Sequence, residues 1–369
     1  MPKIFELFGF PVGVDTPEAN HHRLHARCPF MGCMCDGGGN RMLSTINLNQ
    51  NPALKAIWPD RNEIVPGVCS IRLNDTEQPW IVCPRRLLVL GKRGSQLERA
   101  SQTAVEQKLL SAIEYPIGTK IGVWSEVKLK TSNDEDEDDD RTFDSAFDYV
   151  MMPLDTVSQH DIVGSLGGSW GFWHKTLVGS GYAIMRKGGI DYVNDFPVDE
   201  PYIIEIMTSS TSGANKNKRT TIPHAFEDAF LGHPHNAPGI NKRQVWARMV
   251  SQLIVKSQTA LAWGGKTIWI VQANLVEYIQ ATTALKMREL VSNQLSEVNI
   301  LSFNYGDFIS TETGLIELHS KQQYAGPISP QITENEASFV DIIKTAFVPP
   351  RFSLIKALVK SRWTTKISV

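Results

Sequence analysis

Three segments decide the fold: KIGVWSEVKLK (120–130), RTFDSAFDYVMMP (141–153) and PYIIEIMT (201–208). In the first, apolar and polar side chains alternate, which is typical of a strand with one buried face. The second is expected to return beside the first as its antiparallel partner. The third is a short apolar strand that holds one acid, Glu205. Together the segments predict the sheet of an α/β (α+β) protein.

Helical segments flank these strands. Residues 96–114 carry apolar side chains at helical spacing, and Tyr115-Pro116 ends that segment. Residues 241–262 form an amphipathic pattern, and GKTIWIVQANL (265–275) is apolar enough for an interior strand. The expected order is therefore helix, three strands, helix, strand.

The chain is expected to divide into three regions. Residues 1–95 are rich in Cys, Pro, Gly and Asn and predict a small four-cysteine metal-binding module. Residues 96–275 hold the sheet, with an insert at 155–200 that is rich in glycine, aromatic and basic residues and is too long for a simple turn. Residues 276–369 form a C-terminal region with a basic tail.

Composition narrows the class of protein. The chain has 369 residues, of which 42% are hydrophobic and 21% charged, as in ordinary globular proteins. It lacks a run of about 18 apolar residues, so a membrane-spanning helix is not expected. The start, MPKIFELFGF, lacks the features of a secretory signal. We therefore expect a cytoplasmic protein without a membrane partner.

Charge is unevenly distributed. The net charge is −2, but residues 134–140 read DEDEDDD, and the rest of the chain is net positive. After Asp341 the chain carries only basic charges, at Lys344, Arg351, Lys356, Lys360, Arg362 and Lys366. A basic end of this kind is compatible with a polyanionic partner, and equally with an ordinary solvated surface.

The five cysteines all precede residue 84, in HARCPFMGCMCD (25–36), GVCSI (67–71) and WIVCPRRLL (80–88). In a chain expected to be cytosolic, such a cluster favours a metal site over disulfides. Four thiolates would suit zinc or iron and would stabilise a module with a small core. The alternative is a set of buried cysteines that serve as small core residues.

Three acids fall on the three strand segments: Glu126, Asp148 and Glu205. Each lies in apolar sequence, where an unpaired carboxylate is unfavourable. Carboxylates that converge from neighbouring strands can hold a divalent cation, which activates water for hydrolysis of a phosphodiester bond. Each acid alone has a simpler interpretation as a surface or strand-end residue.

With these motifs the chain resembles the NotI-like type II restriction endonucleases. These are nucleases of the PD-(D/E)xK fold with an appended four-cysteine metal domain. The resemblance rests on CPF (28–30), GVC (67–69) and WIVCPRR (80–86), followed by the strand acids in the same order. It extends to about residue 260.

The resemblance implies a set of site residues. Cys28, Cys69 and Cys83 match three ligands of a structural Fe or Zn ion, and the fourth is Cys35 or Cys33, with Cys35 preferred. The positions of Glu126, Asp148 and Glu205 match the acids that bind catalytic Mg²⁺.

Two features depart from the family pattern. Met207 stands where the third strand usually carries Lys or Gln, and a thioether cannot neutralise phosphate charge. Lys128, two residues after Glu126, could supply the missing ammonium or could be a solvated strand lysine. The insert also brings Asp191, in GGIDYV, as a competitor to Asp148.

The resemblance implies a type II site-specific deoxyribonuclease that acts as a homodimer on palindromic double-stranded DNA, with a cognate DNA methyltransferase encoded separately. Two alternatives stay open: a noncatalytic DNA-binding protein with a degenerate site, and a repair or RNA nuclease of the same fold. Candidate DNA contacts are Lys216, Lys218, Arg219, Lys242, Arg243 and Arg248, although any of these could be ordinary surface charges.

Overall fold

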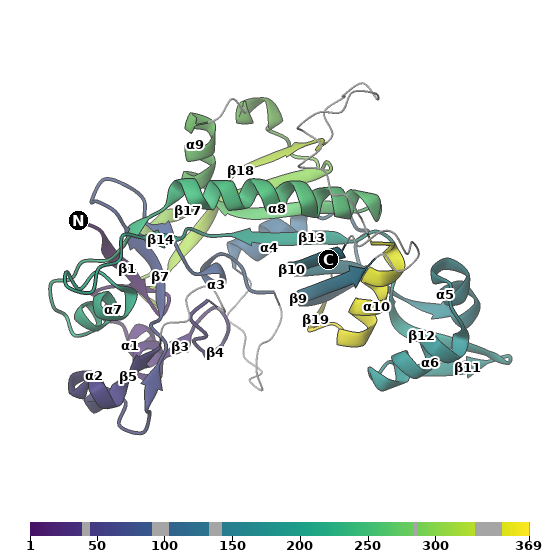
Figure 1. Ribbon diagram of the computed structural model, residues 1–369, viewed down its shortest axis with the longest axis horizontal. Helices are drawn as coiled ribbons and strands as arrows, with labels where there is room; N and C mark the ends of the chain where they lie inside the picture. Colours follow the sequence, from purple (N-terminus) through teal and green to yellow (C-terminus); the bar gives the residue numbers. More distant parts are fainter. Residues whose placement is uncertain (39–44, 91–102, 133–141, 283–285, 329–348, 369) are drawn as a thin grey trace.

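The three segments quoted above form neighbouring strands of one mixed sheet in the computed structural model (Figure 1). The structure describes residues 1–38, 45–90, 103–132, 142–282, 286–328 and 349–368. The acidic run at 134–140 and Lys344 lie outside these ranges. The mixed α/β architecture expected from the sequence is confirmed.

Strand β10 is the hub of the sheet because it pairs with three other strands. Its first part pairs antiparallel with β9 and β13, and its last part pairs with β12. From β13 the sheet continues through parallel β16 and β17 to antiparallel β18. The bounds are β9 (Lys120–Ser132), β10 (Thr142–Ser158), β13 (Tyr202–Met207), β16 (Lys266–Gln272), β17 (Val298–Ile309) and β18 (Ile316–Gly326).

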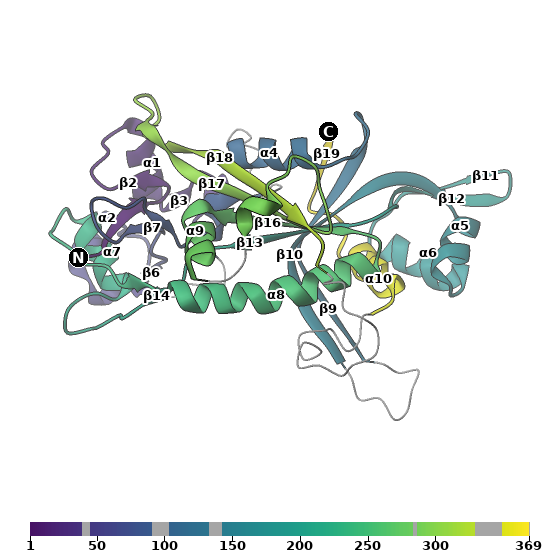
Figure 2. The same ribbon diagram turned by 90° about the horizontal axis from the view of Figure 1, so that it is seen from above.

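Helices cover both faces of this sheet (Figure 2). Helix α4 (Ala104–Ala112) lies on one face, where Leu109 packs in a cluster with Ile204 of β13. Helix α8 (Lys242–Ala262) crosses the other face. Since side chains alternate along a strand, the odd-numbered residues of β13, which include Glu205, point toward α8.

Residues 1–38 and 45–90 form a region of short strands beside the main sheet, built on a four-stranded sheet with the order β2-β1-β7-β8. Its elements are β1 (Lys3–Leu7), β2 (Phe10–Pro11), α1 (Pro17–His25), β3 (Arg27–Cys28), β4 (Cys33–Met34), β5 (Ile46–Asn47), η2 (Leu48–Gln50), α2 (Pro52–Ile57), β6 (Glu63–Ile64), β7 (Val68–Arg72), β8 (Trp80–Ile81) and α3 (Pro84–Leu87).

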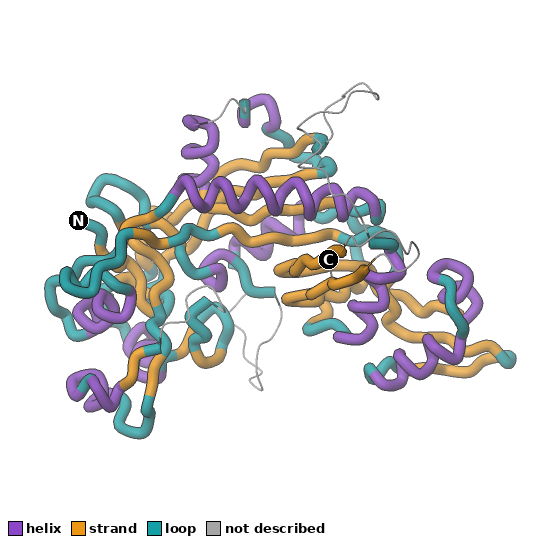
Figure 3. Tube along the Cα trace, viewed as in Figure 1, coloured by secondary structure: helices purple, strands orange, loops and turns teal. Residues whose placement is uncertain are grey.

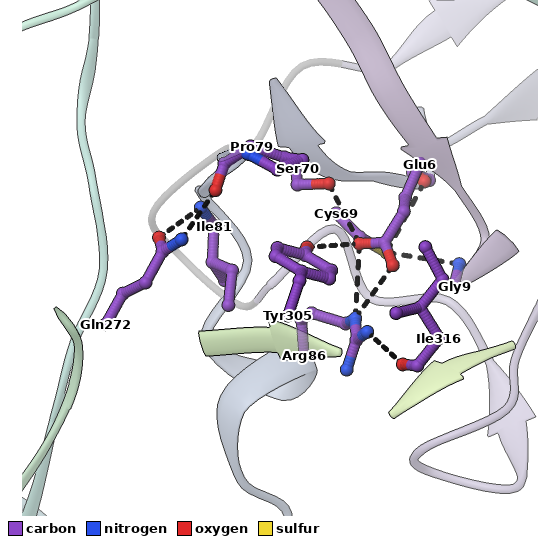
Figure 4. Close-up of polar contacts among 11 residues, drawn as sticks. Glu6, Gly9, Cys69, Ser70, Pro79, Ile81, Arg86, Gln272, Tyr305 and Ile316 are labelled. Carbon is purple, nitrogen blue, oxygen red and sulfur yellow. Dashed lines mark hydrogen bonds and ion pairs between the residues drawn. The ribbon is translucent and has the colours of Figure 1, made fainter. Parts of the chain in front are cut away.

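A buried polar network joins this region to the main sheet (Figure 4). The Glu6 carboxylate is fully buried and accepts hydrogen bonds from Arg86 Nε (3.0 Å), Ser70 Oγ (2.8 Å) and Tyr305 Oη (2.6 Å). Arg86 also donates to the carbonyl of Ile316, at the start of β18. The network therefore ties β1, β7 and α3 to β17 and β18.

The strand expected at 265–275 ends three residues early, at Gln272. The Gln272 side chain accepts a hydrogen bond from Ile81 N (2.8 Å) and donates one to the carbonyl of Pro79 (2.5 Å), as Figure 4 shows. Helix α9 (Ala273–Thr282) then begins at once. The apolar pattern of Ala273, Leu275 and Val276 belongs to the buried face of that helix, which explains the overlong prediction.

The insert is a folded unit rather than an irregular loop. It consists of α5 (Gln159–Leu166), α6 (Trp170–Gly179), β11 (Ile184–Lys187) and β12 (Ile190–Pro197). Trp173 of α6 is fully buried and packs edge-on against Phe352 of helix α10 (Arg351–Ser361). Strand β19 (Thr365–Ser368) follows α10 and pairs with β9 (Figure 3).

The remaining elements are β14 (Thr211–Ser212), α7 (Ile222–Phe230), β15 (Gly239–Ile240) and η3 (Met287–Leu290). No helix within the described ranges is both long enough and apolar enough to cross a membrane.

Candidate active site and cysteine cluster

Three acidic residues occupy neighbouring register positions on β9, β10 and β13. On β9 and β10 the pairs Ser125↔Tyr149 and Val127↔Phe147 enclose Glu126 and Asp148, which are therefore opposite each other. On β10 and β13 the pair Tyr149↔Ile204, continued by one residue, puts Asp148 opposite Glu205. The strand register thus brings the three predicted acids into one row.

Direct contacts join the second and third acids. Asp148 Oδ2 accepts a hydrogen bond from the backbone N–H of Ile206 (2.8 Å), and the backbone N–H of Asp148 points to Glu205 Oε1 (3.4 Å). The Asp148 carboxylate therefore accepts a hydrogen bond from a backbone N–H of β13 that lies just beyond the last paired residues of β10 and β13. This contact fixes the carboxylate at the edge of the ladder.

Glu205 is almost completely buried, at 1% exposure, and its partner is Lys256 of α8. The Lys256 Nζ lies 2.5 Å from Glu205 Oε2, and its side chain is only 8% exposed. Burial raises the pKa of the Glu205 carboxyl to about 8; Lys256 opposes this shift, and the Asp148 carboxylate adds to it. Buried acid–base pairs with a shifted pKa are costly, and they gather at functional sites.

Sequence reasoning missed Lys256 and chose Lys128. Lys128 is exposed on β9, where its strand register puts it opposite Ala146, two residues along the strand from Glu126. The pairing of Lys256 with β13 depends on how α8 crosses the sheet. A usable signal was that Lys256 precedes Ala260 by one helical turn, on the stripe that packs against the sheet.

Met207 is buried at the end of β13, beneath another basic residue of α8. Arg248 Nη2 lies 3.5 Å from Met207 Sδ and 3.3 Å from the carbonyl of Thr208. Two full turns separate Arg248 from Lys256, so both side chains reach β13 from one face of the helix. Of the six candidate DNA contacts, Arg248 is the one that the structure brings to the carboxylate strands.

Glu126 differs from the other two acids. Its backbone has φ +55°, a left-handed conformation that costs a non-glycine residue about 1–2 kcal/mol. Its side chain is 60% exposed and lies 3.1 Å from Arg85 Nη2. Arg85, only 8% exposed, also contacts Asp36 through Nε (3.2 Å) and Nη2 (3.1 Å). Burial lowers the pKa of Arg85, but Asp36 in particular raises it, and the net shift is upward.

Asp191 lies elsewhere. It sits on β12, where its carboxylate accepts a hydrogen bond from Trp170 Nε1 (3.1 Å) and its backbone N–H donates to Gln159 (3.2 Å). Arg186, its partner in the hairpin register, lies 4.0 Å away. These contacts are all internal to the insert, so the row of acids contains Asp148 rather than Asp191.

Four of the five cysteines gather beside α3. Cys28, Cys69 and Cys83 are buried in one cluster, and Cys35 packs against it. Cys33 also borders the cluster, but its thiol is directed to the carbonyl of Met34 (3.6 Å). The backbone also contacts the cluster: the Gly9 N–H donates a hydrogen bond to Cys69 Sγ (3.2 Å).

The four thiols influence one another electrostatically. Burial raises the pKa of Cys28, with further contributions from Cys35 and Cys83, and burial raises the pKa of Cys35 to about 12. A hydrogen bond with Cys69 lowers the pKa of Cys83. As the thiolate is the form that binds metals, a cation here would have to offset this cost of burial.

The other candidate DNA contacts lie apart from the carboxylates. Lys216 and Lys218 are exposed in the turn after β14. Arg219 forms ion pairs with Asp228 (2.8 Å) and Glu227 (3.2 Å). Lys242 lies 4.6 Å from the centre of the Trp80 ring, and Arg243 is exposed on the first turn of α8.

In the part of the chain that the structure describes, no three His, Cys, Asp or Glu side chains are arranged as ready ligands of one metal ion. Arg85 and Lys256 hold the first and third carboxylates instead. No protein-family model matches this chain, and no curated protein matches it significantly.

Proposed function

We propose that this protein is a Mg²⁺-dependent endonuclease of the PD-(D/E)xK fold, similar to the NotI-like type II restriction enzymes. The observation that carries the proposal is the row of Glu126, Asp148 and Glu205 on adjacent strands, with Lys256 buried against the third acid. The order of helix, three strands, helix and strand around this row supports it.

The oxygen donors of the row suit a hard divalent cation. When bound, such a cation would supply Lewis-acid activation of water and neutralise charge on a phosphate. Asp148 and Glu205 would be its principal ligands, and Glu126 would reach it from the exposed side. The Lys256 ammonium, positioned 2.5 Å from Glu205, would offset the charge that develops on the phosphate oxygens. Lys256 thus takes the role for which the sequence suggested Lys128.

Cys28, Cys35, Cys69 and Cys83 would hold a structural Zn or Fe ion. The donor set fits, because four thiolates are the usual ligands of a closed tetrahedral site. Three of them are buried in one cluster, where a metal would satisfy groups whose ionisation burial disfavours. The ion would stabilise residues 1–90, whose strands are mostly short.

The substrate in this proposal is double-stranded palindromic DNA, cut by a homodimer in the cytoplasm, with a separate methyltransferase that protects host DNA. Arg248 and the exposed Lys216 and Lys218 are candidates for contacts to phosphates or base edges.

A digest of plasmid and phage DNA with Mg²⁺ tests this function. We expect discrete fragments with wild-type protein and no cleavage with Asp148→Asn or Glu205→Gln, which each remove a ligand charge. Asp191→Asn, which alters an acid of the insert, is the matched control and should cut. Gel retardation without cleavage would favour the noncatalytic alternative. Cleavage of RNA or of damaged DNA, without discrete duplex fragments, would favour the repair or RNA nuclease.

A further inference from the structure

Arg85 is a buried guanidinium that contacts both Asp36, beside the cysteine cluster, and Glu126, in the row of acids. It follows Cys83 by two residues, and Asp36, its other partner, directly follows Cys35. Its Nη2 lies 3.1 Å from both Asp36 Oδ2 and Glu126 Oε1. A single cation is therefore shared between a carboxylate of the cysteine region and a carboxylate of the proposed Mg²⁺ site.

The two partners of Arg85 are unequally held. Asp36 is the less exposed, at 30%, and it also accepts a hydrogen bond from the backbone N–H of Gly38 (2.9 Å). Glu126 is 60% exposed and occupies a left-handed backbone conformation. Because water screens the more exposed ion pair more strongly, Glu126 is the partner that Arg85 releases at lower cost.

We propose that Arg85 is a positioning residue that holds Glu126 in the DNA-free protein and yields it to the divalent cation when a DNA phosphate takes the place of the carboxylate. This inference rests on the proposed nuclease function. A guanidinium and a divalent cation repel each other and both attract the same carboxylate, so each weakens the other's hold on Glu126. The Arg fork suits a phosphate oxygen as well as it suits a carboxylate. Complete assembly of the cation site is thereby coupled to DNA.

Metal binding without DNA gives the direct test, because it needs no catalysis. Mn²⁺ binding to the DNA-free protein is measured by the loss of its free EPR signal. Arg85→Gln keeps polar atoms but removes the charge. It should tighten Mn²⁺ binding about tenfold, which corresponds to about 1.36 kcal/mol of binding free energy. Asp36→Asn should weaken it severalfold, because Arg85 then has Glu126 as its remaining carboxylate. The double variant should behave like Arg85→Gln.

Controls separate this inference from general damage. Lys120→Gln removes a cation from Asp195 at the far end of β9 and should leave Mn²⁺ affinity unchanged. Elemental analysis should show the same thiolate-bound metal content in Arg85→Gln and Asp36→Asn as in the wild type. A variant that binds Mn²⁺ less well because its fold is lost would also lose that metal and would show a lowered melting temperature.

The DNA side has its own readout. Arg85→Gln should reduce the slope of log affinity against log salt by about one, because one phosphate contact is lost. Its single-turnover cleavage should be slower even at saturating Mn²⁺.

The outcomes distinguish the two proposals. One outcome is that Asp148→Asn abolishes Mn²⁺ binding while Arg85→Gln and Asp36→Asn leave it unaffected. In that case the nuclease site stands and the proposed role of Arg85 is wrong. The proposed role of Arg85 is also overturned if Arg85→Gln weakens Mn²⁺ binding while the fold and thiolate metal are intact. If Asp148→Asn leaves Mn²⁺ binding unchanged, both proposals fail.

Discussion

At the scale of single residues, Lys256 shows how a charge can be supplied from a helix when the strand lacks it. Met207 leaves the third strand without a polar side chain two residues after Glu205, and α8 brings an ammonium to that acid from above. Geometry, rather than spacing along one strand, decides which lysine lies against Glu205.

Substitution of the two lysines tests this choice. Lys256→Gln is expected to slow single-turnover DNA cleavage about 10²–10³-fold, the usual loss for one group that stabilises charge in the transition state. Lys128→Gln, the matched change on the exposed face of β9, should alter the rate less than threefold. The reverse ranking would restore Lys128 as the catalytic ammonium.

The buried Glu205 carboxyl predicts a pH dependence of stability. Its folded-state pKa, about 8, is above its ordinary value, so the folded chain holds a proton that the unfolded chain has released. The free energy of unfolding should therefore fall as pH rises from about 4.5 to 8. Glu205→Gln cannot ionise, and its melting temperature should change less over that range than that of the wild type. The exposed control Glu63→Gln should keep the wild-type slope; an identical slope in Glu205→Gln would contradict the assignment.

At the scale of elements, the cysteine loops are expected to depend on the proposed Fe or Zn ion. Cys83→Ala should prevent binding of the proposed Fe or Zn ion and unfold the cysteine region, because it removes one of four thiolates. Cys33→Ala should keep about one metal ion per chain, since its thiol is directed to Met34. Elemental analysis with circular dichroism measures both, and metal loss in Cys33→Ala with retention in Cys35→Ala would exchange their roles.

The helix α10 is expected to be a structural cover for the insert and β9. Leu358 is fully buried in the cluster that also holds Trp173, so Leu358→Ala should lower the free energy of unfolding by about 2–5 kcal/mol. Lys360→Ala, exposed on the same helix, should change it by less than about 0.5 kcal/mol. Urea denaturation compares the two, and equal effects would mean that α10 contributes little packing.

Local patterns revealed the strands of the site but not how distant parts meet. Alternation and apolar runs located β9, β10, β13 and α8 to within a few residues. A half-buried strand or helix needs apolar side chains at a regular spacing, and this spacing is visible in the sequence. The burial of Trp173 against Phe352 joins residues 179 positions apart, and no local period records such a contact. The same applies to Lys256 with Glu205 and to Arg85 with Glu126.

At the scale of the whole molecule, the Glu6 network is a buried connection between the cysteine region and the main sheet. Glu6→Gln would leave the buried Arg86 without its counter-charge, at a cost of about 3–5 kcal/mol. We expect a marked fall in melting temperature. Lys266→Gln, which breaks the exposed pair with Glu114, should cost at most about 1 kcal/mol. Equal melting temperatures for the two variants would show that the network is dispensable.

The pairing of β19 with β9 has a consequence for biosynthesis. Thr365 pairs with Val123, so the first part of one β9 edge, Lys120–Val123, has no β19 partner while about 240 further residues are translated. At roughly 5–20 residues per second, that wait is on the order of 10–50 s. An unpaired strand edge is a template for association with other chains. Nascent chains on neighbouring ribosomes are therefore most prone to aggregate during this interval, and a chaperone that shields β9 would raise the yield of native protein.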